Sequence, residues 1–184
     1  MGIRPGRSVR DMDKVAWTRF SKTKPRRSYI KAMPHKDLNV FRMGAMKPGY
    51  TTEFDLVCEG DIILRDNAIE SARQTANKHM EKNTPMAYYF IVRVYPHHVT
   101  RENKMISGAG ADRLQKGMRQ SFGRPVDRAA RVNKGQPVFT IYTIDANAGH
   151  ARAAFTKARK KLFTYLKMHR VYSLINCTRL FLQW

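Results

Sequence analysis

The stretch that decides the fold class is residues 67–96, NAIESARQTANKHMEKNTPMAYYFIVRVYP. Its first half has apolar residues at helical spacing, which indicates an amphipathic helix with one face in a core. These residues are Ile69, Ala72, Ala76 and Met80. Asn67 is placed to cap this helix, and Glu70 follows three residues later as in a capping box.

The second half of the stretch predicts a central strand of a sheet. Residues 87–95 are rich in aromatic and β-branched side chains, stay apolar on both faces as far as Arg93, and are followed by Pro96. Upstream of the helix, residues 51–58 alternate as a strand does, and residues 62–64 add a short apolar piece.

The downstream region predicts a hairpin, a second helix and a final strand. Residues 128–132 and 138–143 flank a turn in which Gly135 supplies the positive φ of a β-hairpin. Asn147 can cap the helix. The apolar stripe of that helix is Ala151, Phe155, Ala158 and Leu162. With a strand around residues 171–175, two helices on one side of a mixed β-sheet give the expected fold class, α+β.

Charge is distributed unevenly along the chain. The 184 residues have a formal net charge of +21, which exceeds what solubility requires and favours a polyanionic partner, nucleic acid first. Residues 1–50 carry +10, residues 101–150 carry +5 and residues 151–184 carry +8, whereas residues 51–100 carry −2. The near-neutral block therefore corresponds to folded core.

Residues 1–50 have the composition of an extended basic arm, because prolines interrupt them and the apolar residues show no sustained period. Trp17, Phe20 and Tyr29 are interleaved with the cations, which suits phosphate contacts and base stacking. A disordered solubilising tail is the alternative. The arm residues that we expect to bind RNA are Arg4, Arg7, Arg10, Arg19, Lys22, Lys24, Arg26 and Arg27.

The second helix has a basic face opposite its apolar stripe, formed by Arg152, Lys157, Arg159, Lys160 and Lys161, of which we expect the first four to bind RNA. Residues 151–184 contain no acid that could neutralise it. A merely solvated face would have the same pattern, but the total charge favours contact with RNA phosphates.

A long glycine-rich loop covers residues 103–125. It has too few apolar groups to offset the entropy of ordering it alone, and loops of this length are usually functional or disordered. Its glycines allow the backbone to approach RNA closely, and its cations suit phosphates. The loop residues expected to face RNA are Lys104, Gly108, Gly110, Arg113, Lys116, Arg119 and Arg124.

Catalytic and nucleotide-binding motifs are missing from the sequence. A dinucleotide fingerprint would need a third glycine at Arg113, and no phosphate loop of the form Gly-x-x-x-x-Gly-Lys-Ser/Thr occurs. His97 and His98 are adjacent and point to opposite sides of an extended chain, so they cannot readily chelate one metal. We expect no catalytic residue, metal or cofactor; an RNA-modifying enzyme using His97 or His98 is the enzymatic alternative.

Cysteine usage favours a reducing cytoplasm. Cys58 and Cys177 are far apart and form no Cys-x-x-Cys pair, which gives no support to a disulfide framework or a zinc ribbon. No apolar run resembles a signal peptide or reaches the roughly 18 residues that suggest a membrane span, so no membrane partner is expected.

The loop sequence NKMISGAGADRLQKGMR, residues 103–119, resembles the signature of the large-subunit ribosomal protein family called ten-e in archaea and eukaryotes. The bacterial counterpart of that family is ribosomal protein L-sixteen. Shorter stretches agree with the resemblance, which covers roughly residues 1–162: Arg4-Pro5, residues 76–80, residues 93–99, and residues 130–132 with Gly135-Gln136.

The resemblance implies an α/β-hammerhead fold that binds large-subunit rRNA near 5S rRNA, among neighbouring ribosomal proteins of the cytoplasmic ribosome. It also implies that the central loop, residues 103–124, points toward the peptidyl transferase region and meets tRNA transiently. The expected function is a structural constituent of the large ribosomal subunit that acts in translation. The alternative that composition allows is a free nucleic-acid-binding module, such as a tRNA or rRNA chaperone or a chromatin protein.

The C-terminal end departs from the family pattern. Family members generally close the second helix with a proline and a short strand, whereas residues 163–184 read FTYLKMHRVYSLINCTRLFLQW. A lineage-specific end and a frameshifted reading both fit, and no RNA site is assigned there. The expected organisation is one domain over residues 1–184. It comprises an arm at 1–50, a core at 51–162 that contains loop 103–125, and a divergent tail at 163–184.

Overall fold

Two antiparallel sheets and two helices form the body of the protein. A computed structural model describes residues 30, 33–103, 123–162 and 166–172, with side chains only as far as residue 169 in the last segment. In chain order the elements are β1 (Arg42–Gly44), β2 (Thr52–Cys58), β3 (Ile62–Arg65), α1 (Asp66–Asn83), β4 (Tyr88–Val92), β5 (His98–Glu102), β6 (Arg124–Val132), β7 (Pro137–Thr143), the short 3-10 helix η2 (Asp145–Asn147), α3 (Ala148–Arg159) and β8 (Leu166–Tyr172).

The larger sheet has the strand order β1-β4-β7-β2-β8, and the smaller one has the order β3-β6-β5. Every residue of β4 is buried, and β4 lies between β1 and β7, which confirms the predicted interior strand. In β2 the side chains of Phe54, Leu56 and Cys58 alternate toward the core as expected from the sequence.

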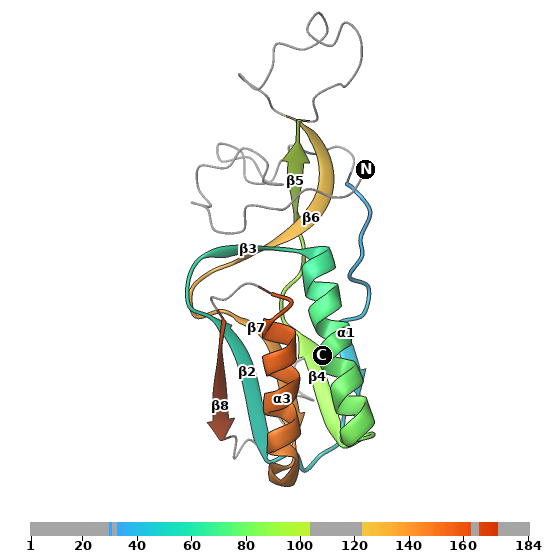
Figure 1. Cartoon of the computed structure of the whole chain (residues 1–184), viewed down its shortest axis with the longest axis vertical. Coiled ribbons are helices and arrows are strands. Elements are labelled where there is room, and N and C mark those ends of the chain that lie inside the picture. The colour runs from blue at the N-terminus through green and yellow to red at the C-terminus, as the bar shows by residue number, and fades with distance from the viewer. Residues whose placement is uncertain (1–29, 31–32, 104–122, 163–165, 173–184) are drawn as a thin grey trace, which may run out of the picture.

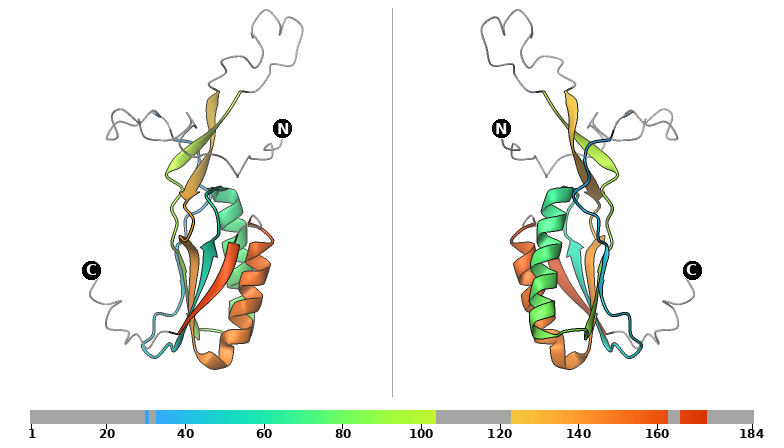
Figure 2. Two further views of the ribbon diagram at one scale, coloured as in Figure 1. Left: turned by 90° about the vertical axis from the view of Figure 1, so that its left-hand side faces the viewer. Right: turned by 90° about the vertical axis from the view of Figure 1, so that its right-hand side faces the viewer.

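Both helices cover the same face of the larger sheet (Figure 2). The predicted stripes are buried: Ile69, Ala72, Ala76 and Met80 on α1, and Ala151, Phe155 and Ala158 on α3, with Leu162 beyond its end. The Phe90 ring meets Phe139 and Phe155 edge-on, with centroids 5.3 and 6.5 Å away, and so joins the sheet to α3. The α+β class is confirmed. None of the helices within the described ranges is long and apolar enough to cross a membrane.

The predicted capping box at Asn67 is wrong. Helix α1 begins one residue earlier, at Asp66, and Glu70 accepts a hydrogen bond from Nε of Arg73 (2.8 Å) instead of capping. The buried Asp66 carboxylate serves the helix start, because its oxygens accept the backbone N–H of Asn67 (2.8 Å) and that of Asp37 (3.1 Å). Asp37 lies 29 residues upstream, so local spacing could not indicate this contact.

The predicted hairpin of residues 128–143 is also wrong, because β6 and β7 belong to different sheets. The turn between them contains Gly135 at φ +82°, as expected, but it carries the chain from one sheet to the other. The carbonyl of Cys58 accepts the Gly135 N–H (2.8 Å), and the Cys58 N–H donates to the carbonyl of Gln136 (3.1 Å). The β2–β3 connection also runs from one sheet to the other. It lies beside the β6–β7 turn, and the two connections are hydrogen-bonded to each other.

Both ends of the described chain add to the larger sheet. Strand β1 pairs with β4, and Leu38, which precedes β1 within the expected arm, is fully buried. The second of the predicted helices is followed by β8, which starts at Leu166 rather than near residue 171 and pairs with β2. Leu166 lies opposite Cys58 and is buried.

Candidate RNA interface

The β5–β6 pair projects from the body beyond the ends of both helices (Figure 1). Asn103 and Gly123, at its far end, are the described residues that flank the glycine-rich loop. Arg124, which the sequence predicted in the loop, is instead the first residue of β6, where it lies opposite Glu102 and is exposed. The remaining predicted loop residues, Lys104, Gly108, Gly110, Arg113, Lys116 and Arg119, lie outside the described residues.

The base of the loop is closed by tight backbone packing. Gly123 has φ +71°, and a Cβ placed on it would lie only 2.8 Å from the carbonyl carbon of Glu102. Arg101 reinforces this contact by donating from Nη1 to the Gly123 carbonyl (3.0 Å). The two ends of the loop are therefore held side by side, and only glycine fits the position that joins them.

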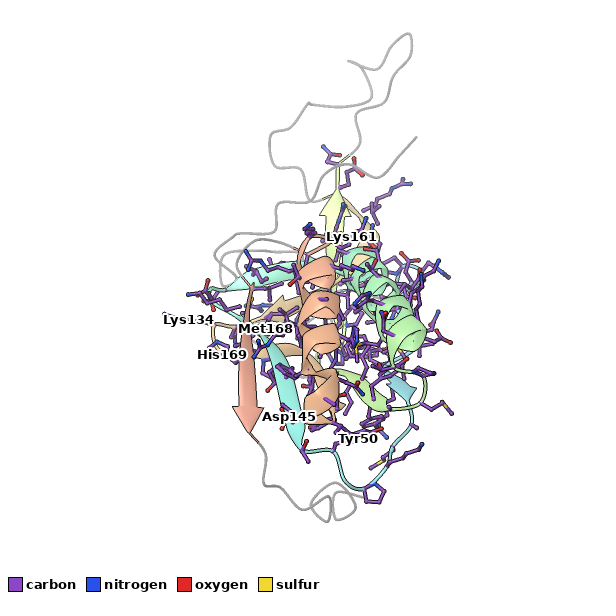
Figure 3. All side chains as sticks on the ribbon, turned by 60° about the horizontal axis from the view of Figure 1, so that its bottom comes forward. Tyr50, Lys134, Asp145, Lys161, Met168 and His169 are labelled. Carbon is purple, nitrogen blue, oxygen red and sulfur yellow. The ribbon has the colours of Figure 1, made fainter. Side chains whose placement is uncertain are left out.

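The basic face of α3 is where the sequence predicts it. Arg152, Lys157, Arg159 and Lys160 are all exposed, and Lys161 lies at the end of α3 nearer the β5–β6 projection (Figure 3). Within the described part of the chain, none of the four predicted residues forms an ion pair with an acid. The face thus keeps its positive charge available.

The seam between α1 and α3 adds imidazoles to this surface. Lys157 donates from Nζ to Nδ1 of His79 (2.8 Å), and the His79 ring lies 6.3 Å from that of His150. Partial burial is the main cause that lowers the pKa of His79, and the nearby charges of Lys157, His150 and Lys82 lower it further. A neutral His79 therefore accepts from Lys157 and positions its ammonium group. Sequence reasoning did not single out His79, because a contact between two helices leaves no signal in local spacing.

Cations on the smaller sheet were also missed. Arg101, Arg128 and Arg131 lie on β5 and β6, and Nε of Arg128 donates to the carbonyl of Pro34 (2.9 Å). Arg128 thereby fixes the segment that leads out of the arm. The excess charge of residues 101–150 was the signal that could have found these residues, but spacing did not separate them from the loop.

The predicted arm residues cannot be placed on this surface. Arg4, Arg7, Arg10, Arg19, Lys22, Lys24, Arg26 and Arg27 lie outside the described residues. Their role in RNA binding stays a prediction.

One carboxylate cluster has the donor type of a metal site. Oxygens of Asp37, Asp66 and Asp127 lie within 4.8 Å of one another. However, Nε of Arg65 is 3.2 Å from Oδ2 of Asp127, and a hydrogen bond joins Asp127 to Asp66. Burial, the hydrogen bond to Asp66 and the charge of Asp66 raise the pKa of Asp127 to about 7. The proton held by Asp127 and the guanidinium of Arg65 therefore offset two of the three carboxylate charges of this cluster.

The histidine pair that the sequence singled out is split between two environments. His97 is exposed and its ring packs on Tyr95 at 4.5 Å, whereas His98 is the first residue of β5 and is half-buried. Neither belongs to the carboxylate cluster.

A small α+β body with uncompensated cations on one helix and a basic loop on a projecting strand pair is typical of ribosomal proteins. The chain belongs to the family described as Ribosomal protein L16p/L10e, whose model matches residues 17–169. The resemblance of the loop signature is thereby confirmed.

Relatives in archaea extend over nearly the whole chain. Large ribosomal subunit protein uL16 of Methanococcus aeolicus is 43% identical over 163 residues, which cover 88% of this chain and 90% of that protein. The protein of the same name from Thermofilum pendens is 42% identical over 163 residues, covering 88% and 93%. That from Natronomonas pharaonis is 38% identical over 167 residues, covering 88% and 90%.

Proposed function

We propose that this ribosomal protein is a structural constituent of the large subunit that binds rRNA through its arm and the basic face of α3. The basic loop faces the tRNA sites and the peptidyl transferase region, with 5S rRNA and other ribosomal proteins nearby. The observation that carries the proposal is the exposed, unneutralised basic face of α3 in a chain of net charge +21. Family membership and the names of the archaeal relatives support the subunit assignment.

A division of labour follows from the positions of the cations. The basic face of α3 lies on the body, where contacts to phosphates would hold the protein in place. The β5–β6 strand pair, which the loop connects, projects beyond the ends of both helices (Figure 1). A loop that does not anchor the protein is free to contact a ligand that comes and goes, such as tRNA.

Cosedimentation with large subunits through washes of rising salt tests the anchoring role. Changing Arg152, Lys157, Arg159 and Lys160 together to Gln should release the protein at lower salt, because phosphate contacts depend on charge. The matched control exchanges Arg and Lys at the same four positions and should be retained as the wild type is. Recovery of the wild-type protein only in the free pool would contradict the proposal.

The loop role has a separate test. Changing Lys116 and Arg119 to Gln should impair tRNA handling or subunit maturation while the unfolding temperature of the purified protein stays unchanged. If the same change unfolds the protein, the loop residues support the fold instead.

A further inference from the structure

Three aromatic rings from two segments of the chain form a short column at the surface. Phe41 lies just before β1, Tyr95 follows β4, and His97 lies just before β5. Phe41 and Tyr95 are stacked, with ring centroids 5.3 Å apart and planes 18° apart. The His97 ring continues from Tyr95 at 4.5 Å with a tilt of 45°.

The backbone beneath the column is fixed by the core. The Val92 N–H donates to the carbonyl of Phe41 (2.8 Å), and the His97 N–H donates to that of Tyr95 (3.0 Å). Val94 is 3% exposed and anchors the strand extension on which Tyr95 sits. The rings are therefore held in position before any ligand binds, which lowers the entropy cost of binding.

The column nevertheless remains open to solvent. Tyr95 is 40% exposed, and the His97 side chain is also exposed. Phe41 is partly buried against the core, whereas Tyr95 and His97 are exposed, unlike the core rings of Phe90 and Phe139, which lie at 0% exposure. The solvent-exposed parts of Tyr95 and His97 are where a flat ligand would bind.

A cation stands beside the rings. Nζ of Lys36 lies 6.0 Å from the centroid of Phe41 and 5.7 Å from that of Tyr95. Within the described segments Lys36 forms no ion pair with an acid, although its neighbour Asp37 pairs with His35. An aromatic face combined with an unpaired ammonium group matches the two parts of a nucleotide, the base and its phosphate.

We propose that Phe41, Tyr95 and His97 form a stacking site for an unpaired RNA base, with Lys36 binding the adjacent phosphate. The site lies outside the basic face of α3 and the glycine-rich loop. The choice of RNA as the ligand rests on the proposed ribosomal function. The site itself rests on the ring geometry and on Lys36, so it can fail independently.

The test uses full-length protein and two short single-stranded RNAs of equal length, one an oligouridylate and the other the same backbone with abasic positions. Binding is measured at a salt concentration that suppresses nonspecific phosphate contacts. Tyr95→Leu removes the ring, and Tyr95→Phe keeps it. Tyr95→Leu should weaken binding of the oligouridylate about tenfold, since stacking of one base contributes on that scale. Tyr95→Phe should bind as the wild type does.

The abasic RNA separates stacking from charge. It should bind wild type and Tyr95→Leu equally, whereas Lys36→Gln should weaken binding of both RNAs. If Tyr95→Leu lowers the thermal unfolding temperature, His97→Gln, at the exposed end of the column, replaces it and should also weaken only the oligouridylate. Equal binding of the oligouridylate by wild type and the ring-deleted variants, or equal loss for both RNAs, would overturn the stacking site. Either result leaves the subunit cosedimentation unaffected and so does not bear on the ribosomal role.

Discussion

At the scale of single residues, the buried carboxylates show how the fold controls ionisation. Asp127 is 6% exposed and hydrogen-bonded to Asp66, and burial with this neighbour raises its pKa from the ordinary 3.8 to about 7, against the pull of Arg65. The folded protein therefore binds this proton more tightly than the unfolded chain does. Charging Asp127 costs folding free energy.

The raised pKa of Asp127 determines the direction in which the free energy of unfolding changes with pH. Below pH 3.8 both states are protonated at Asp127, and between pH 3.8 and about 7 only the unfolded state releases the proton. The free energy of unfolding of the wild type should therefore fall, relative to that of Asp127→Asn, as the pH rises through this window. Urea unfolding of both proteins over a pH series measures this difference in the free energy of unfolding. Parallel curves would show that Asp127 does not hold its proton in the folded state.

Gly123 supports a second prediction at this scale. Its φ of +71° and the approach of the Glu102 backbone leave no room for a Cβ. Gly123→Ala should therefore lower the free energy of unfolding by more than about 1 kcal/mol or open the base of the loop. Gly149→Ala is the matched control, because nothing lies within 4 Å of its Cβ position and alanine favours a helix. Hydrogen exchange at Arg101 and Glu102 reports the opening; equal protection in both variants would contradict it.

At the scale of elements, the helices and interior strands could be predicted because burial imposes a period on the sequence. The stripe from Ile69 to Met80 and the alternation of β2 follow from local spacing. The turn at Gly135 could not be resolved, because one positive-φ turn serves a hairpin and a crossing between sheets equally well. Which of the two forms depends on the strands that β6 and β7 pair with, and those strands lie far from the turn in the sequence.

Strand β8 gives a prediction about the C-terminal end of the described chain. Leu166 is fully buried against the larger sheet, whereas Met168 on the same strand is 37% exposed (Figure 3). Leu166→Ala should reduce the free energy of unfolding by about 2–5 kcal/mol. Met168→Ala should change it by less than about 1 kcal/mol. Denaturant unfolding of the two variants compares them, and similar small effects would mean that β8 adds little to the fold.

The basic face of α3 makes its own prediction about RNA binding. Each phosphate contact contributes about 0.7 to 0.9 to the slope of log K against log salt. Changing Arg152 and Arg159 to Gln should therefore make that slope shallower for binding of the protein to rRNA. For Lys78→Gln and Lys134→Gln, which change exposed cations on α1 and in the β6–β7 turn, the slope should change less. Filter binding or fluorescence anisotropy over a salt series is the measurement, and equal slopes for both pairs would remove α3 from the interface.

At the scale of the whole molecule, charge is separated from the core. The near-neutral residues 51–100 contribute β2, β3, α1 and β4, while the basic blocks contribute α3 and the strand pair that carries the loop. Composition could predict this separation, but not that one helix face and one projecting strand pair would display the charge. Their positions on one body are the basis of the proposed division between anchoring and tRNA contact.

The most direct test is a map of the intact large subunit that contains this protein. The account predicts that Arg152, Lys157, Arg159 and Lys160 lie against rRNA phosphates and that the end of the β5–β6 projection points toward the tRNA sites. A map in which α3 faces solvent or another protein, or in which the projection points away from the tRNA sites, would contradict it.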